Sequence, residues 1–277
     1  FSSRRRHTSS SWVTGVQTFA LPIWRTIIRS ITTTDDLTLV GGWCLEGGSD
    51  LGALAGMPPI GIKASATLAA GLSETKPDIV IDFTHTDLLR ENLTTYLERN
   101  LDVVVGTTGL TDEQLEPFAA EVSKRGLRWA VIPNYGLGIT LVRDFIKTAR
   151  KFYPYVSIVD RHPATMANAP SGTAADLAHV ASSEPIGACT SRESYEGVLG
   201  GRIEGVQVLS QRMPWPGPYS EHEITLARED EVIRVTVEDH SSEIYMDGLF
   251  LTARKLASLP PGSFVRTLSE VMAFNPR

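Results

Sequence analysis

The segment with the clearest chemical potential is residues 168–174, Asn-Ala-Pro-Ser-Gly-Thr-Ala, which begins six residues after His162. Pro170 fixes its own φ and disfavours helix at the residue before it, so a new element is expected to begin here. Ser171 is a good N-cap, and the amides after it would lie at the positive end of a helix dipole. Such a helix start suits a carboxylate or a phosphate, although an ordinary capped surface helix has the same residues.

Strand and helix patterns alternate in the first half of the chain. Buried strands are expected at 37–43, 77–83, 101–105 and 128–132, with helices at 86–99 and 111–124. In the second helix, Thr111 and Gln114 form a capping-box pattern. The alternation predicts a parallel, doubly wound α/β sheet, in which ligands bind at the carboxyl ends of the strands. Those ends are residues 83–84, 106–108 and 133–135.

The pattern changes after Tyr135. A helix at 138–152, a strand at 156–159 and a helix up to about residue 182 are followed by strands at 205–210, 221–226 and 232–237, and then by a helix at 248–257. Alternating strands of this kind favour an antiparallel or mixed sheet with one covered face. We therefore predict a first domain at 24–133, completed by 244–277, and a second, α+β domain at 134–243.

Composition narrows the classes of function. The chain has 277 residues, a formal charge of −6 and two cysteines, Cys44 and Cys189, which are far apart in the sequence. A negative net charge argues against broad nucleic-acid binding, and no apolar run is long enough to cross a bilayer. The cysteines indicate neither a disulfide framework nor a zinc site, and a reducing cytoplasm is the expected compartment. No metal is predicted, because no His or carboxylate pattern has ligand spacing.

The first 23 residues, FSSRRRHTSSSWVTGVQTFALPI, differ from the rest. They contain three consecutive arginines and a serine cluster, and they show no sustained helical or strand period. A secretory signal would need a longer apolar core, whereas a transit peptide has a comparable composition. We favour a third interpretation, in which the string is foreign to the gene. It is then excluded from the fold, and Trp24 starts the first authentic helix.

Four motifs in order resemble the dihydrodipicolinate reductase (4-hydroxy-tetrahydrodipicolinate reductase) family, whose members make a lysine precursor. The motifs are Ile-Asp-Phe-Thr at 81–84, Val-Gly-Thr-Thr-Gly at 105–109, Pro-Asn-Tyr-Gly-Leu-Gly at 133–138 and Ala-Pro-Ser-Gly-Thr-Ala at 169–174. Weaker matches are Ser-Tyr-Glu-Gly at 194–197, Glu-His-Glu at 221–223 and the segment 248–257. The similarity extends from Trp24 to about Phe274.

The resemblance implies a Rossmann-like domain that binds NADH or NADPH, and a second domain that binds a small carboxylate substrate and builds a homotetramer. It places a set of residues at the cofactor, namely Phe83, Thr84, Gly106, Thr107, Thr108, Pro133, Asn134 and Tyr135. Glu46 lies near the position of the adenosine ribose, with Leu45 as the alternative, so the choice between NADH and NADPH stays open. The family's Gly-rich loop is expected just before Trp24 and is missing from the sequence there, which predicts a sheet without its first strand and poor cofactor binding.

The resemblance also locates the chemistry, which requires a hydride, a proton and anchors for carboxylates. Ser171, Gly172 and Thr173, here called the helix-start cradle, correspond to the substrate anchor, and His162 is the candidate acid. Four positions depart from the family pattern: Pro163 replaces a His, Met166 a Lys, Asn168 an Asp and Glu243 a basic residue. Methionine has no ionisable proton, so Met166 cannot be the acid. Arg161 is a candidate substitute cation.

Three hypotheses follow. The first is an NAD(P)H-dependent reductase of 4-hydroxy-tetrahydrodipicolinate, in the lysine and diaminopimelate pathway. The second is a divergent paralogue that reduces another imine or enamine acid, which the loss of cations would explain. The third is a non-catalytic homologue that binds the cofactor.

Overall fold

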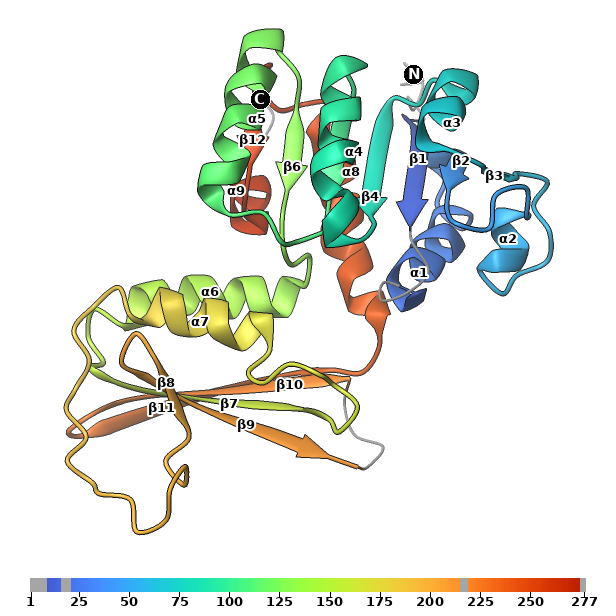
Figure 1. Cartoon of the computed structure of the whole chain (residues 1–277). Coiled ribbons are helices and arrows are strands. Elements are labelled where there is room, and N and C mark those ends of the chain that lie inside the picture. Colours follow the sequence, from blue (N-terminus) through green and yellow to red (C-terminus); the bar gives the residue numbers. More distant parts are fainter. Residues whose placement is uncertain (1–8, 16–20, 215–218, 275–277) are drawn as a thin grey trace, which may run out of the picture. The chain divides into compact units, whose positions relative to one another are not determined.

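The computed structural model describes residues 9–15, 21–214 and 219–274, and the chain divides into two compact units (Figure 1). The first unit comprises residues 1–135 and 245–277, and the second comprises residues 136–244. The domain boundaries expected from the sequence, 133/134 and 243/244, lie within two residues of these. In the described part of the chain, no helix has the length and apolar character that crossing a membrane requires.

The first unit is built on a seven-stranded sheet in the order β12-β6-β5-β4-β1-β2-β3, with every pair parallel. This confirms the predicted doubly wound, Rossmann-like sheet. Strand β4 is buried along its whole length, as expected of a strand covered on both faces. The strands are β1 (Ser9–Gly15), β2 (Leu37–Trp43), β3 (Ala64–Ser65), β4 (Ile79–Phe83), β5 (Asp102–Val105), β6 (Trp129–Val131) and β12 (Phe264–Val265).

Helices cover both faces of this sheet (Figure 1). Helix α4 packs beside α5, and α8 packs beside α1 and α9. The predicted capping box at Thr111 is present at the start of α5. The helices of this unit are α1 (Leu21–Ile31), α2 (Leu51–Leu54), α3 (Leu68–Thr75), α4 (Thr86–Glu98), α5 (Asp112–Arg125), α8 (Met246–Leu256) and α9 (Leu268–Ala273).

The structure corrects the expectation for the N-terminal segment. Residues 9–15 form β1, which runs between β2 and β4 at the middle of the sheet, so the sheet does have a strand in this place. Without it, the N–H and C=O groups on the facing edges of β2 and β4 would lack partners, and β-forming residues such as Trp12 and Val13 favour the extended form. Helix α1 also starts earlier than predicted, at Leu21. Residues 16–20, where the Gly-rich loop was expected, lie outside the described residues.

The second unit has a mixed five-stranded sheet in the order β11-β10-β7-β9-β8. Helices α6 (Leu137–Ala149) and α7 (Gly172–Ala181) pack beside each other on one face of the sheet (Figure 1). Their apolar side chains join inward strand residues such as Ile158 and Ile224 in one core. The strands are β7 (Tyr155–Pro163), β8 (Gly201–Ile203), β9 (Val206–Met213), β10 (Ser220–Arg228) and β11 (Glu231–Asp239).

Strand β7 is longer than the sequence pattern suggested. It continues to Pro163, so His162 lies within the strand rather than in the loop after it. Side chains alternate between the two faces of a strand, and Val156, Ile158 and Asp160 are buried on the side that faces the core. His162 shares this face, and β7 therefore places a carboxylate and an imidazole at the end of an apolar row.

Candidate functional site

A group of ionisable side chains in the second unit surrounds Asp160, whose side chain has 0% exposure. His222 lies directly opposite Asp160 in the pairing of β10 with β7, and the helix-start cradle begins at Ser171. Ser210 and Arg212 reach the same carboxylate from β9. We call these six residues, including His162, the Asp160 cluster.

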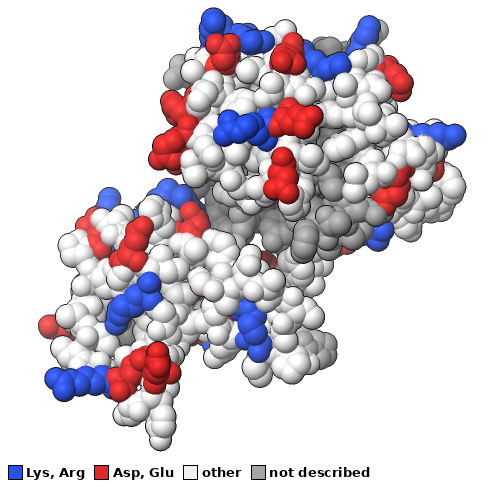
Figure 2. All heavy atoms as spheres, in the orientation of Figure 1, with Lys and Arg blue, Asp and Glu red and all other residues white. Residues whose placement is uncertain are grey.

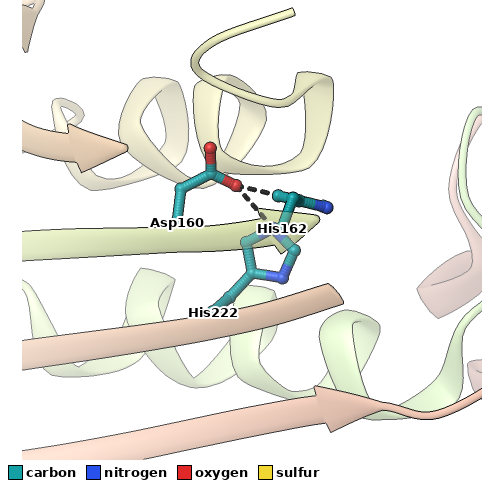
Figure 3. A group of neighbouring side chains, drawn as sticks. All are labelled: Asp160, His162 and His222. Atoms are coloured by element: carbon teal, nitrogen blue, oxygen red, sulfur yellow. Dashed lines mark ion pairs between the residues drawn. The ribbon is translucent and has the colours of Figure 1, made fainter. Parts of the chain in front are cut away.

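One oxygen of Asp160 faces both imidazole rings (Figure 3). Its Oδ1 lies 2.8 Å from Nε2 of His162 and 3.4 Å from Nε2 of His222. The two rings meet edge to face, with centroids 5.5 Å apart. Neither contact has the alignment of a good hydrogen bond, so these are ion-pair contacts between buried groups. Both rings are almost fully enclosed, with side chains 7% and 2% exposed.

The other oxygen of Asp160 binds donors from two elements, the start of α7 and strand β9. Oδ2 accepts from the backbone amide of Ser171 at 3.0 Å, from Oγ of Ser210 at 3.2 Å and from Nη2 of Arg212 at 2.9 Å. The same Nη2 also donates to the carbonyl of Asn168 at 2.8 Å. The guanidinium thus joins β7, β9 and the loop that leads to α7.

These contacts keep Asp160 ionised. Burial by itself would raise the pKa of the carboxyl group, because it removes water from the charged form. The contacts with His162, His222 and Ser171 act in the opposite direction and outweigh burial, so the pKa of Asp160 lies well below its ordinary value. The carboxylate is therefore a permanent negative charge near neutral pH.

The predicted start of helix α7 is confirmed. Ser171 is its N-cap, and its Oγ accepts from the amide of Ala174 at 3.1 Å. The same Oγ lies 3.2 Å from Nε2 of His222, which links the cap to the Asp160 cluster. Gly172 is exposed, and a Cβ built there would meet nothing within 4 Å. The helix start is thus rigidly capped and open on its outer side, as an anion site requires.

Arg161 does not supply the substitute cation that the sequence suggested. Strand alternation turns it to the opposite face of the sheet from Asp160 and His162. There its guanidinium contacts Glu221 and Glu223 and donates to Gln211 through Nε. The cation beside the helix-start cradle is instead Arg212, which the sequence analysis did not single out.

Three other residues that depart from the family pattern, Pro163, Met166 and Glu243, lie in a turn or a short helical segment. Pro163 ends β7, and its carbonyl accepts from the amide of Met166 at 3.0 Å. The two residues therefore form a tight turn that bears no ionisable side chain. Glu243 is exposed and belongs to a short 3₁₀ segment, Ser242–Tyr245.

Asp160, His162 and His222 also have the ligand types of a metal site. Three of their donor atoms lie within 4.8 Å of one another, a cluster that sequence spacing did not reveal because His222 is distant along the chain. Asp160 is already paired with the Arg212 guanidinium, however, and His222 lies at hydrogen-bond distance from Ser171. A metal cation would have to compete with this internal cation for the same carboxylate.

The first unit contains a second buried aspartate, Asp82, near the carboxyl end of β4. Its Oδ1 accepts from the amide of Thr84 at 2.9 Å and from Oγ of Thr107 at 3.1 Å. Its Oδ2 accepts from Nδ2 of Asn92 at 3.1 Å and from the hydroxyl of Tyr96 at 2.7 Å. We call these five residues the Asp82 cluster. It ties the end of β4 to the turn after β5.

The residues predicted at the cofactor fall into two groups. Four are buried and serve the packing of the sheet end, namely Phe83, Thr84, Thr107 and Tyr135. The hydroxyl of Tyr135 donates to the carbonyl of Val105, and burial raises its pKa well above the usual range. Thr108 and Pro133 are exposed, and Asn134 is half-buried.

Two further predicted residues have particular surroundings. A Cβ at Gly106 would lie 2.2 Å from the ring of Phe83, so a larger residue cannot stand there without moving the ring. Glu46 follows β2, and its Oε2 is buried with no hydrogen-bond partner among the described residues. The nearby thiol of Cys44 has its pKa raised to about 11, chiefly by burial, and the charge of Glu46 adds to this rise.

Sequence reasoning missed Asp160, Ser210 and Arg212, and it noted His222 only as part of a weak match. A signal for two of them exists. In β7 and β10, Asp160 and His222 occupy positions in phase with buried residues such as Ile158 and Ile224. A polar residue on the apolar face of a strand needs a buried partner. Which partner it has depends on strand pairing, which this sequence alone does not specify.

Comparison with known proteins gives consistent matches. Two family models match, dihydrodipicolinate reductase, N-terminus, over residues 23–135, and dihydrodipicolinate reductase, C-terminus, over residues 138–272. The 4-hydroxy-tetrahydrodipicolinate reductase of Desulfitobacterium hafniense is 30% identical over 241 residues, covering 85% of this chain and 90% of the relative. That of Moorella thermoacetica is 28% identical over 239 residues, covering 85% and 89%.

Solved structures agree on the fold. A dipicolinate-bound dihydrodipicolinate reductase from Paenisporosarcina sp. TG-14 superposes with a TM-score of 0.80 at 23% identity, over 95% of this chain and 99% of the other. An amine dehydrogenase from Mycobacterium smegmatis gives a TM-score of 0.66 at 14% identity, over 98% of each chain.

Proposed function

The chain belongs to the dihydrodipicolinate reductase family, and we propose that it reduces 4-hydroxy-tetrahydrodipicolinate with a nicotinamide dinucleotide. The observation that carries this proposal is the helix-start cradle beside His162, held together by buried Asp160. Reduction of an unsaturated acid requires a site that binds the carboxylate and a group that supplies a proton. The helix-start cradle and the imidazole of His162, both in contact with Asp160, provide these two functions. The curated relatives with this activity match most of the chain.

The first unit has features that fit the cofactor. The buried Oε2 of Glu46 lacks a hydrogen-bond partner among the described residues, and a ribose hydroxyl would provide one. Thr108, Pro133 and Asn134 follow the ends of β5 and β6, where ligands of such sheets bind. When bound, NAD(P)H supplies the hydride. Because a carboxylate at Glu46 would repel a ribose phosphate, we propose that NADH is preferred over NADPH.

The second unit supplies binding and the proton. The amides at the start of α7 bind a substrate carboxylate, because they lie at the positive end of the helix dipole. His162 delivers a proton to the reduced substrate, the role of a general acid. Asp160 is fully buried, so it acts on the substrate only through these neighbours.

The proposal extends to the setting of the protein. We propose that the chain assembles as a homotetramer, as the family resemblance implies, and that it works in the cytoplasm. The thiols of Cys44 and Cys189 are both free, in keeping with a reducing compartment. Size-exclusion chromatography with light scattering would decide the assembly.

His162→Gln tests the proposed activity. With NADH and freshly generated substrate, we expect kcat to fall by about 10²-fold or more, the usual contribution of a placed acid. His179→Gln is the matched control, because His179 is exposed on α7 and pairs with Glu204 at the surface. Its kcat should stay within about twofold of the wild type. Equal turnover of the two variants would contradict the role of His162.

The same assay separates the alternatives. The cradle lies beside Arg212, a cation already committed to Asp160, and Arg161 faces away. This arrangement would also suit a substrate with one carboxylate. Turnover only with monocarboxylate imines would favour the divergent paralogue, and NADH binding without any turnover would favour the non-catalytic homologue. A lower KM for NADPH than for NADH would contradict the proposed preference.

A further inference from the structure

Asp160 connects two parts of the second unit that the chain brings from different elements. Its Oδ1 faces His162 in β7, and its Oδ2 accepts from the amide of Ser171 at the start of α7. The proposed acid and the proposed anion site therefore share one carboxylate. A shift of that carboxylate would change the position of both.

Arg212 provides a second connection between the same parts. Its Nη2 reaches both Oδ2 of Asp160 and the carbonyl of Asn168, and its Nη1 donates to the carbonyl of Asp160 at 3.1 Å. The loop 168–171 is thus held at both ends, by Arg212 at Asn168 and by Asp160 at Ser171. Because the guanidinium is planar and binds several acceptors at once, it fixes direction as well as distance.

His222 completes the arrangement from the opposite strand. Its Nε2 lies 3.4 Å from Oδ1 of Asp160 and 3.2 Å from Oγ of Ser171, the atom that caps α7. With a side chain only 2% exposed, it contacts the cap and the carboxylate rather than solvent. The helix cap and the carboxylate are therefore linked by a backbone amide and by an imidazole.

We propose that Asp160, supported by Arg212, is a positioning residue that holds the helix-start cradle and His162 in one fixed arrangement for the reaction. This proposal rests on the proposed function, and it adds a role for a side chain that has no access to the substrate. An error of about 1 Å in the placement of reacting groups can cost about 10²-fold in rate, so a shared anchor for acid and anion site has a large effect.

Asp160→Asn is the main test, because it keeps the shape of the side chain and removes its charge. We expect kcat to fall by about 10²-fold. The dissociation constant of pyridine-2,6-dicarboxylate, measured by calorimetry on the full protein, should rise by about tenfold, the equivalent of one hydrogen bond. The dissociation constant of NADH should change by less than about twofold, because Glu46 and the strand ends of the first unit are untouched.

Two further variants accompany this test, a milder change in the Asp160 cluster and a control on the surface. Ser210→Ala removes one hydrogen bond to Oδ2 and keeps the charge, so we expect the same changes on a smaller scale, about threefold, even if Asp160→Asn folds poorly. Asp176→Asn is the control, because Asp176 is an exposed carboxylate on α7 that pairs with Arg143. Equal effects of Asp160→Asn and Asp176→Asn on kcat would overturn the proposal.

A double variant shows whether Asp160 acts through His162. In a His162→Gln background, Asp160→Asn should lower kcat by no more than about threefold further, while its effect on dicarboxylate binding through Ser171 persists. Fully multiplicative losses of kcat would overturn the action through His162. Loss of NADH affinity in parallel with kcat would show a general disruption and would also overturn it.

A spectroscopic measurement separates this proposal from the proposed function. If the wild-type protein neither reduces the substrate nor binds the dicarboxylate, the proposed function fails. The ¹⁵N spectrum of labelled histidine, with the His162 signals assigned by His162→Gln, still reports on the contact with Asp160. We expect Asp160→Asn to move the ring-nitrogen signals of His162, and unchanged signals would overturn the positioning role.

Discussion

Asp82 and Asp160, the aspartates that are buried in the described part of the chain, have contrasting surroundings. Both have no exposed surface, and both lie toward the end of a strand. Asp82 is surrounded by neutral donors, whereas Asp160 faces a guanidinium and two imidazoles. Neutral donors can fix the shape of a turn, but only the second set contains imidazoles, which can serve as general acids or bases. We therefore expect the first cluster to be architectural, and the second contains the residues proposed to act on the substrate.

Of the changes considered, removing the charge of Asp160 should cause the largest loss of stability. Asp160→Asn leaves the partly buried Arg212 guanidinium without its carboxylate, and breaking a buried ion pair from one side costs about 3–5 kcal/mol. We expect this loss in the free energy of unfolding, measured by urea denaturation at pH 7. A smaller loss in Asp160→Asn than in Asp82→Asn would contradict the expected order of the two effects.

Neutralising Asp82 should cost less. In Asp82→Asn the amide group would face the hydroxyl of Tyr96 or the Thr84–Thr107 pair, so at least one hydrogen bond to a charged acceptor is lost. Such bonds contribute about 1.5–3 kcal/mol each. The same urea titration measures this loss. Turnover with saturating substrate should fall less than in Asp160→Asn, and an equal fall would show that the architectural cluster is also functional.

Acid should weaken the contribution of Asp160 to stability. The folded-state pKa of Asp160 lies below its unfolded value of about 3.9, so its ionisation stabilises the protein above about pH 4, and this stabilisation is lost as pH falls toward the folded value. The stability difference between the wild type and Asp160→Asn should therefore shrink between about pH 5 and pH 3. Burial opposes the lowered pKa, and the contacts with His162, His222 and Ser171 produce it. A constant difference across this range would contradict the lowered pKa.

The smallest effect on stability is expected at the exposed contact between helices α6 and α7. Arg143 and Asp176 join α6 to α7 through a contact of 2.8 Å, but the carboxylate is 47% exposed. Exposed pairs contribute about 0.2–1 kcal/mol, so Arg143→Gln should change the free energy of unfolding by no more than this. A change as large as that of Asp160→Asn would show that attachment of α7, rather than the buried carboxylate, sets the stability of the cluster.

The sequence predicted most of the fold because hydrophobic periodicity is a local property. The buried strand at 79–83, the capping box at Thr111 and the helix start at Ser171 all follow from neighbouring residues. Strand β1 was missed because its place depends on two partners, β2 and β4, that need it at the centre of the sheet. The residues of the segment itself do not specify that it pairs with β2 and β4.

The site was only partly predictable for the same reason. Ser171 and His162 belong to one continuous segment, so the sequence predicts them together as site residues. The carboxylate that joins them has its other partners on β9 and β10, tens of residues farther along the chain, and no local pattern specifies which strands pair. The orientation of Arg161 depends on the register of β7, so its role could be decided only once the strand was known to extend to Pro163.

The alternation along β7 has a consequence for how this protein can evolve. Asp160 and His162 point to one face and Arg161 to the other, so adding or removing a single residue in the strand would exchange the two faces. A basic side chain would then enter the core while the carboxylate and imidazole turned outward. Insertions and deletions within β7 are therefore disfavoured, whereas substitutions keep each position on its face. New substrate preferences can then arise by substitution in a strand of constant length.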